Sequence, residues 1–447
     1  MPFASDQNAN SAVSSGGKGT APLRFVDYRT ALLLVIANMV GTGVFTTLGF
    51  QADGVPDGAA LLLLWAVGGL VALCGALSYA ELAAALPRSG GEYHFLSRIY
   101  HPVLGRLAGL ISVTVGFSAP VALAAMALGR YAGTFLPVEP LWIGLVTVLG
   151  VTALHAFDVR LGGRFQVAAT LVKVAVILLF CAAGLLHTPV AGSLPLAPTP
   201  DSLAAVFSAP FGLSLIYVSY AYSGWNAAAY IVDEVRSPQH TVPRALVRGT
   251  LIVTGLYLLL NLTFLRTTGL DELAGTLEVG ALSAHNIFGA SGGVILSLVL
   301  SLLLVSTISA MVLAGPRVLE VIGEDVPALR ALSVRNRRGA PTRAVLLQQG
   351  LAVVFILTDA FEAVLTLTGF TLTLFALLTV LGVFRLRRRE PDLPRPFRVP
   401  LYPLPPLMFV LISGATLLVV LWQQPLAVLV GSGLLGLGAW WLRRRSE

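Results

Sequence analysis

Two stretches of this chain place small and polar residues inside long apolar runs. In the first, residues 36–45, Gly41 and Gly43 flank Thr42. In lipid, irregular backbone is tolerated only where it lines a cavity or is buried in protein. We interpret this stretch as a helix break. A half-helix that begins at Val44 would direct its free N–H groups at an anion such as a carboxylate. A close packing contact between two helices would explain the glycines equally well.

The second stretch is Ser223-Gly224-Trp225-Asn226, in the sixth apolar run. Ser223 lies thirteen residues before Arg236, and Gly41 lies twelve residues after Arg29. These separations are roughly 20 Å and 18 Å along a helix, so we expect both breaks at similar depth. Interrupted segments at corresponding places in two halves of a chain indicate a transporter site between repeats.

Lys173 is a cation in the middle of the fifth apolar run. It lies nine residues from Arg164, roughly 13 Å along a helix and near the middle of a hydrocarbon core about 30 Å thick. At that depth an ammonium must pair with carbonyl or hydroxyl oxygens. We expect the carbonyls of the first break and, of the candidates Ser306, Thr307 and Ser309, the hydroxyls of Ser306 and Ser309. A lysine that only joins two helices is an equally good interpretation.

Other reactive residue types form no recognisable site. The six histidines lie in loops or at the ends of apolar runs, without metal-ligand spacing or a nucleophile nearby. No phosphate-binding loop is present, and Cys74 and Cys181 lie in apolar segments. We therefore expect no enzyme, no metal and no cofactor. Glu81, at the end of the second run, is either a helix-end acid paired with an arginine or a proton carrier.

Composition indicates a polytopic membrane protein. Of 447 residues, 56% are hydrophobic and 11% are charged, whereas soluble proteins have about 25% charged residues. The net charge of +7 lies in short loops, so we expect no nucleic-acid partner. Twelve runs have about the length that a helix needs to cross a bilayer: 30–50, 58–86, 103–135, 140–156, 166–186, 204–234, 246–265, 291–322, 342–358, 361–384, 405–422 and 426–442.

Arginines are concentrated in alternate loops between these runs. They lie at 88–106, 160–164, 236–248, 330–343 and 385–398, while the other loops carry acids and almost no Lys or Arg. By the positive-inside rule both termini are cytoplasmic, in the plasma (inner) membrane. The first run then starts inside and the sixth outside, which favours an inverted repeat. The expected units are a disordered tail at 1–23, repeats at 24–200 and 201–390, and two further helices with the cytoplasmic C-terminus at 391–447.

Four motifs, taken together, are specific: Gly41-Thr42-Gly43-Val44-Phe45, Tyr79-Ala80-Glu81-Leu82, Pro87-Arg88-Ser89-Gly90-Gly91-Glu92-Tyr93 and Tyr222-Ser223-Gly224-Trp225-Asn226. With them the chain resembles the amino acid, polyamine and organocation (APC) transporter superfamily. Within it the chain most resembles the L-type amino acid transporters and their bacterial relatives. The resemblance implies an all-α protein of 12 transmembrane helices, a five-plus-five inverted repeat with the leucine-transporter-like fold, and helices 1 and 6 broken at mid-membrane.

The resemblance also implies a substrate site. The substrate carboxylate would be held by the amides of Thr42, Gly43 and Val44, and its ammonium by carbonyls at both breaks. Tyr220 stands where relatives carry an aromatic that closes over the substrate, and Asn226 where a polar side chain touches the ligand. The expected substrate-binding residues are Met39, Val40, Gly41, Thr42, Gly43 and Val44, then Tyr220, Ala221, Tyr222, Ser223, Gly224, Trp225 and Asn226.

The implied function is sodium-independent secondary transport of neutral L-amino acids by alternating access, as exchange or proton-linked uptake. Lys173 would replace the ion of a sodium-coupled cousin, with Ser306 and Ser309. The alternatives are a sodium-coupled symporter on the same fold and a transport-deficient sensor or channel. Animal L-type proteins bind a heavy subunit through a cysteine between spans three and four. This chain has no cysteine in that loop, so we expect no such subunit. The outer loop 269–291 is a lid or a passive connection.

Overall fold

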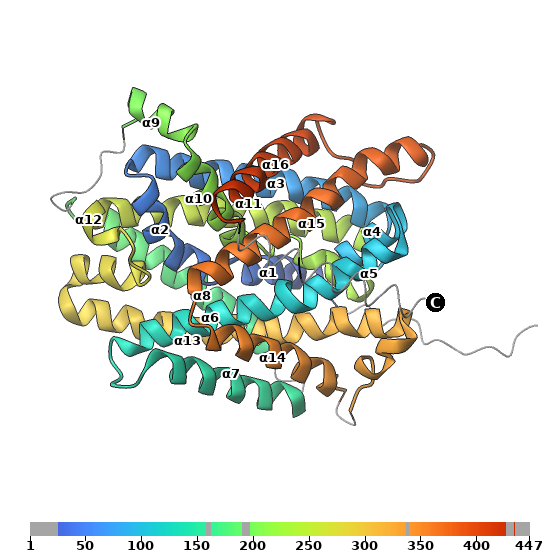
Figure 1. Ribbon diagram of the computed structural model, residues 1–447, viewed down its shortest axis with the longest axis horizontal. Coiled ribbons are helices and arrows are strands. Elements are labelled where there is room, and N and C mark those ends of the chain that lie inside the picture. The colour runs from blue at the N-terminus through green and yellow to red at the C-terminus, as the bar shows by residue number, and fades with distance from the viewer. Residues whose placement is uncertain (1–25, 158–161, 190–196, 337–338, 426–432, 434–447) are drawn as a thin grey trace, which may run out of the picture.

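The computed structural model describes residues 26–157, 162–189, 197–336, 339–425 and 433 (Figure 1). The described residues form helices and one isolated backbone bridge, between Val26 and Val235. The expected tail at 1–23 and the expected span at 426–442 lie outside them, apart from residue 433.

Nine α-helices lie in the described part of the chain up to Val206. Their bounds are α1 Tyr28–Met39, α2 Gly43–Gly54, α3 Gly58–Ala85, α4 Glu92–Ile99, α5 Pro102–Ile111, α6 Ser118–Gly133, α7 Pro140–Phe157, α8 Gly162–Leu186 and α9 Pro200–Val206. A π-helical turn, Ser112–Phe117, joins α5 to α6.

The later helices are α10 Ala209–Ala221, α11 Pro238–Thr267, α12 Leu270–Leu273, α13 Val279–Asp325, α14 Thr342–Leu357, α15 Phe361–Arg389 and α16 Leu404–Gln423. Short 3-10 turns cover Ala227–Tyr230, Val232–Glu234 and Pro327–Leu332.

The helices confirm a polytopic, all-helical membrane protein. In the described part of the chain, 8 helical segments are long and apolar enough to cross a membrane, or 9 if the bent pair α9 and α10 is one span. α1 and α2 count there as one segment, and α7 and α14 are apolar but shorter. The twelve-helix count and the inverted repeat stay predictions.

The first predicted break separates α1 from α2. α1 ends at Met39 and α2 begins at Gly43. Figure 1 shows α1 in the middle of the bundle, and it packs against α8, α11 and α13. The last four residues of α1 are all buried. The break therefore lies inside protein, which is where irregular backbone can be satisfied.

The sixth apolar run departs from the predicted span 204–234. α9 and α10 meet at a bend of 67°, and α10 ends at Ala221, after which only 3-10 turns follow. Gly224 has φ +95°, and a Cβ there would lie 2.7 Å from the backbone of Asn38. The chain leaves α-helical geometry because it passes this close to the end of α1.

The loop 269–291 is mostly helical. It contains α12 and the start of α13, which is kinked at Gly289 with φ 77°. The backbone N–H of Gly275 donates to Gly49 of α2 at 3.0 Å, and Leu273 is fully buried. The loop therefore lies against α2, and a short helix from Val279 to the kink at Gly289 precedes the predicted start of the eighth span at 291.

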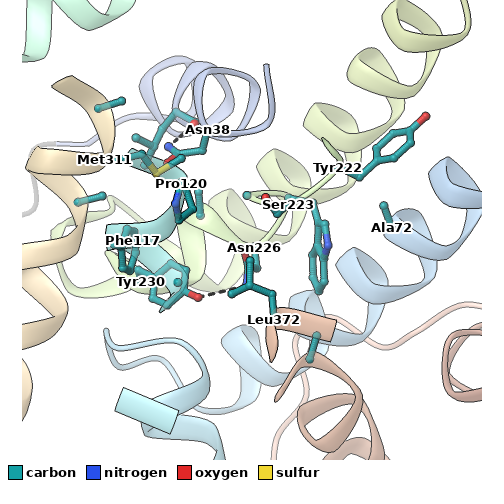
Figure 2. A pocket seen from close by; sticks show the side chains of 18 of the residues that line it. Asn38, Ala72, Phe117, Pro120, Tyr222, Ser223, Asn226, Tyr230, Met311 and Leu372 are labelled. Atoms are coloured by element: carbon teal, nitrogen blue, oxygen red, sulfur yellow. Dashed lines mark hydrogen bonds between the residues drawn. The ribbon is translucent and has the colours of Figure 1, made fainter. Parts of the chain in front are cut away.

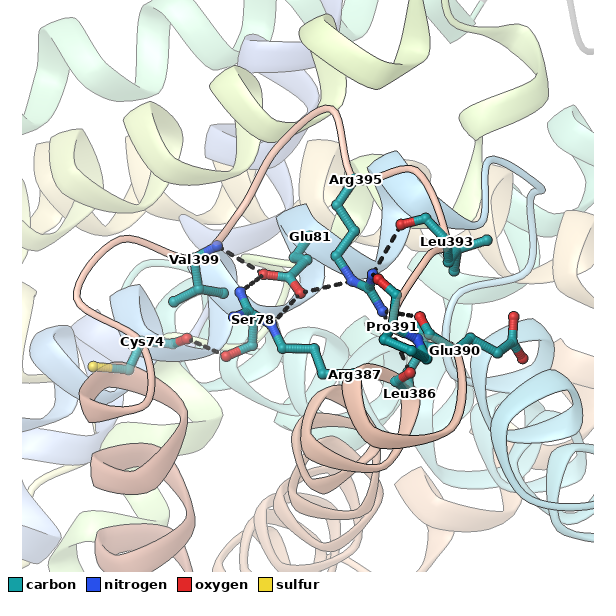
Figure 3. Close-up of polar contacts among 10 residues, drawn as sticks. All are labelled: Cys74, Ser78, Glu81, Leu386, Arg387, Glu390, Pro391, Leu393, Arg395 and Val399. Carbon is teal, nitrogen blue, oxygen red and sulfur yellow. Dashed lines mark hydrogen bonds and ion pairs between the residues drawn. The ribbon is translucent and has the colours of Figure 1, made fainter.

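Glu81 is buried at the end of α3 and pairs with arginines. Its carboxylate accepts hydrogen bonds from Arg387 at 2.6 and 2.8 Å and from the Val399 N–H at 2.7 Å (Figure 3). Arg395 lies 3.5 Å away, with its side chain 5% exposed. Of the two roles that the sequence left open, the structure shows the paired helix-end acid. The contacts fix the loop between α15 and α16 to α3.

We predict that Glu81→Gln lowers the thermal unfolding midpoint of the purified protein in detergent. The change leaves the charges of Arg387 and Arg395 without their carboxylate, and breaking a buried pair costs roughly 3–5 kcal/mol. Glu390→Gln is the control, because the Arg98–Glu390 pair is partly exposed at 47% and 31% and such pairs contribute about 0–1 kcal/mol. Equal midpoints for the two variants would contradict this prediction.

Candidate functional site

A cavity of about 260 Å³ lies beside the second break. Its lining extends from Ser223 and Asn226 to Thr30, Glu234 and Arg317, at the end of the bundle where α1 begins. Figure 2 shows Asn38, Ser223, Asn226 and Tyr230 around this space. A mostly apolar cavity with a few polar groups is the usual form of a small-molecule site.

The predicted substrate residues divide into two groups. Those of the second break line the cavity: Tyr222, Ser223, Gly224, Trp225 and Asn226. The others lie outside its lining: Met39, Val40, Gly41, Thr42, Gly43, Val44, Tyr220 and Ala221. Most of the second group are buried, with Thr42 2% exposed.

Direct contact between α2 and α10 explains why the amides of the first break lie outside the lining. The hydroxyl groups of Thr42 and Tyr220 share a hydrogen bond of 3.0 Å. A Cβ added at Gly43 would lie 2.5 Å from the Cα of Ala221, so only glycine permits this approach. The contact between α2 and α10 therefore covers one side of the breaks. The opposite side, formed by residues 222–226, faces the cavity.

Protein donors already bond the carbonyls that were predicted to hold the substrate ammonium. The Tyr257 hydroxyl, from α11, lies 2.5 Å from the Met39 carbonyl oxygen and 3.0 Å from that of Ala221. The Ser223 N–H donates to Tyr220 at 2.8 Å. Each carbonyl has two lone pairs. The Met39 carbonyl also accepts from the Gly41 N–H at 2.8 Å, so both of its lone pairs are used, whereas the Ala221 carbonyl keeps capacity for a further donor. Tyr257 joins the ends of α1 and α10.

Lys173 of α8 contacts the first break, as the sequence predicted. Its Nζ donates to the Val40 carbonyl at 3.2 Å and to Thr307 Oγ1 at 2.7 Å, and the residue is 2% exposed. Thr307 Oγ1 donates its own proton to the Leu303 carbonyl at 3.2 Å. Its lone pairs therefore accept from the ammonium.

The sequence favoured Ser306 and Ser309 as the hydroxyl partners of Lys173, but in the structure neither of them bonds to Lys173. The Ser306 hydroxyl is buried without a protein partner, and that of Ser309 bonds to Nε2 of His155 at 2.8 Å. Successive residues of a helix are rotated by about 100°, so only one of three neighbouring hydroxyls can face α8. That residue is Thr307.

A second buried carboxylate, Glu92 at the start of α4, reaches the cavity. It is 6% exposed and accepts three hydrogen bonds. Tyr79 and Asn226 donate to Oε1, both at 2.7 Å, and Tyr230 donates to Oε2 at 2.5 Å. We call these four residues the Glu92 cluster. Two residues further along α4, burial lowers the pKa of His94 to about 4, so this imidazole is neutral at pH 7.

Sequence reasoning did not place four residues of this site: Asn38, Glu92, Tyr230 and Tyr257. Each is a polar side chain in or beside an apolar run, and that is the signal that could have found them. Glu92 lies within a motif quoted for the resemblance, and Asn38 lies within the first glycine stretch. Among the described residues no group of three or more His, Cys, Asp or Glu could hold a metal ion.

The arrangement can bind a small polar molecule, and the chain around it has known relatives. The sequence model of a family described as Amino acid permease matches residues 26–435. The serine/threonine exchanger SteT of Bacillus subtilis is 28% identical over 90% of this chain and 93% of its own length. The large neutral amino acids transporter small subunit 2 of Mus musculus is 26% identical over 96% and 82%, and the b(0,+)-type amino acid transporter 1 of Mus musculus is 24% identical over 94% and 87%.

The match to the family covers all the helices that form the cavity, both breaks and Lys173. Membership of a family of amino acid permeases is consistent with the apolar helices and with a site that offers backbone and hydroxyl groups for binding. These relatives are transporters, so the chain is not expected to be an enzyme. The chain belongs to the amino acid permease family, within the APC superfamily of membrane transporters.

Proposed function

We propose that this chain is a sodium-independent secondary transporter of neutral L-amino acids that works by alternating access, as an exchanger or with proton-linked uptake. The observation that carries the proposal is the one-sided cavity at the helix breaks. It extends to Thr30 and Arg317 at one end of the bundle, while contacts of Thr42 and Gly43 with α10 cover the breaks at the other. A site that is accessible from one side at a time is what alternating access requires.

Sodium independence is supported by the position of Lys173. Its ammonium contacts one backbone carbonyl and one hydroxyl oxygen between α1, α8 and α13. Oxygen ligands of this kind also suit a hard cation such as Na⁺. The Lys173 ammonium occupies the lone pairs of these two oxygens and supplies the positive charge that a sodium ion would otherwise bring.

The preference for neutral substrates is supported by the charges around the cavity. Among its described lining residues the charged side chains are Glu92, Glu234 and Arg317. Arg317 pairs with Glu234 at 3.2 Å, so a substrate carboxylate in the side chain would find no free cation. Glu92 already accepts three hydrogen bonds, which makes it a weak partner for a cationic side chain.

The amides of Thr42, Gly43 and Val44 are proposed to bind the substrate carboxylate once α2 and α10 separate. As the first N–H groups of a helix they have no partner one turn earlier, and they carry its positive dipole end. The substrate ammonium is proposed to bind the carbonyls at the ends of α1 and α10. Trp225 and Tyr220 then flank the substrate.

The proposal includes the topology of the whole chain. We propose twelve spans in the plasma (inner) membrane, with repeats at 24–200 and 201–390 and two further spans at 391–447. Both termini and the arginine-rich loops would then lie in the cytoplasm. The cavity would then face the cytoplasm. Cys74 and Cys181 are both buried, so we propose no disulfide-linked subunit.

We predict that proteoliposomes with the purified chain take up labelled neutral L-amino acids at the same rate in sodium and in potassium buffer. Internal amino acid should accelerate uptake if exchange dominates, and an inward proton gradient should do so if protons are coupled. Uptake that requires sodium would favour the symporter, and binding without uptake would favour the sensor.

We predict that Lys173→Ala and Thr307→Val reduce uptake strongly, because each removes one side of the contact between α8 and α13. Ser306→Ala is the matched control on the same helix. Its hydroxyl has no protein partner, so uptake should stay near the wild-type rate. Strong loss in Ser306→Ala with normal uptake in Thr307→Val would contradict the assignment of the coupling hydroxyl.

We predict that Tyr257→Phe lowers the transport rate by about tenfold while the protein stays folded. The change removes the hydroxyl between the Met39 and Ala221 carbonyls, and an unpaired buried polar group costs about 1–3 kcal/mol. Tyr100→Phe is the control, since it removes a similar bond to the Leu378 carbonyl at 3.0 Å, away from the breaks. Equal uptake rates in the two variants would show that Tyr257 has no special role.

A further inference from the structure

The cavity presents hydrogen-bond acceptors. The Asn38 Nδ2 group donates to the Leu34 carbonyl at 2.8 Å. The Asn226 Nδ2 group donates to Glu92 Oε1 at 2.7 Å and lies 3.3 Å from the Tyr230 hydroxyl. Both asparagines line the cavity. Each amide nitrogen carries two N–H groups. Asn226 uses both on the protein and Asn38 uses one, so the part of Asn226 that remains for a ligand is its carbonyl oxygen, an acceptor.

The orientation of the Asn226 amide is set by Glu92. An ionised carboxylate only accepts hydrogen bonds, so the nitrogen of Asn226, and not its oxygen, must face it. Tyr230 supports the same orientation, because its proton goes to Glu92 Oε2 and its oxygen lone pair accepts from Asn226. A rotated amide would place the Asn226 oxygen against the carboxylate. Figure 2 shows the bond between Tyr230 and Asn226 at the edge of the cavity.

We propose that Glu92 is a positioning residue for substrate selection, and that it fixes the Asn226 Oδ1 atom as an acceptor for a hydroxyl group on the substrate side chain. The inference rests on the proposed function and specifies its substrate class as small hydroxyl-bearing L-amino acids, such as serine and threonine. A site built to accept from a hydroxyl discriminates against the analogue that lacks it, because its buried acceptor is left unpaired.

A hydroxyl fits the cluster better than a charged group does. A side-chain carboxylate would bring a second negative charge and further lone pairs toward Asn226 and Glu92. A side-chain ammonium would need Glu92 as its counter-ion, yet both oxygens of that carboxylate are occupied by Tyr79, Asn226 and Tyr230. A neutral donor needs only the free lone pair of the amide oxygen.

The test compares threonine with valine, which has a methyl group in place of the hydroxyl. Purified full-length protein in proteoliposomes is assayed for uptake of both labelled amino acids, and for binding of both by thermal shift in detergent. Wild type should prefer threonine by about tenfold or more in uptake efficiency. Glu92→Gln should reduce that ratio several-fold, because a glutamine side chain can donate to the Asn226 oxygen and release the amide to rotate.

Two phenylalanine variants make the test specific. Tyr230→Phe removes an acceptor of the Asn226 nitrogen and should also lower the threonine-to-valine ratio. Tyr79→Phe is the matched control. It removes another phenol donor of Glu92 but leaves the contacts of Asn226 in place, so the ratio should be retained. For any variant that transports too little to measure, the threonine-to-valine ratio is taken from binding instead. The same holds if the chain binds amino acids without transporting them.

Several results would overturn the inference while leaving the proposed function intact. Wild-type transport without preference between threonine and valine would do so, as would a preference for valine. Equal losses for threonine and valine in Glu92→Gln would show that Asn226 contacts the α-ammonium or that Glu92 is only structural. Failure of wild type to bind or carry any amino acid would instead overturn the proposed function, and this inference with it.

Discussion

A helix that ends inside an apolar bundle leaves carbonyl groups without N–H partners from the next turn, and this structure depends on how those carbonyls are satisfied. α1 and α10 both end near the middle of the bundle, at Met39 and Ala221. The hydroxyl of Tyr257 lies within hydrogen-bond distance of both end carbonyls and shares its one proton between them, and Lys173 donates to the Val40 carbonyl beside them. The Met39 carbonyl also accepts from the Gly41 N–H at 2.8 Å, but without Tyr257 and Lys173 the Ala221 and Val40 carbonyls would lose these partners, and an unpaired buried group costs about 1–3 kcal/mol. One phenol and one ammonium therefore help to satisfy the ends of both interrupted helices.

These donors also connect the cavity to helices that do not line the breaks themselves. Tyr257 belongs to α11 and Lys173 to α8, and Thr307 extends the contact to α13. A substrate ammonium needs the same kind of oxygen acceptors, so if it binds there as proposed, its arrival changes what the phenol and the lysine can bond. Binding at the breaks would then be coupled through individual hydrogen bonds to three surrounding helices. This is a physical route by which a zwitterionic ligand, without net charge, would shift the arrangement of the bundle.

Sequence alone predicted the apolar helices, the first break, the interruption of the sixth run and the contact of Lys173 with the first break. These follow from local patterns, because run length, glycine and depth along a helix are readable without tertiary structure. The contacts of Thr307, Tyr257 and Glu92 were not predictable in the same way. Which of three adjacent hydroxyls faces α8 depends on the rotation of α13, and the end of α10 depends on the close approach of Gly224 to Asn38. The twelve-helix count, the inverted repeat and the substrate contacts remain predictions.

Two buried carboxylates, Glu81 and Glu92, lie close together in the sequence but differ in their partners. Glu81 is bound by Arg387 and a backbone N–H, with Arg395 nearby, whereas Glu92 is bound by neutral hydroxyl and amide donors. Separating a buried ion pair leaves two uncompensated charges, at roughly 3–5 kcal/mol for the loss of one partner. The neutral donors around Glu92 can each break their hydrogen bond to the carboxylate and bond to water instead, one bond at a time. The end of α3 with the loop before α16 is therefore suited to remain together during transport. The segment from Asn226 to Tyr230 is held by bonds that can be replaced singly, so movement around the cavity should begin there.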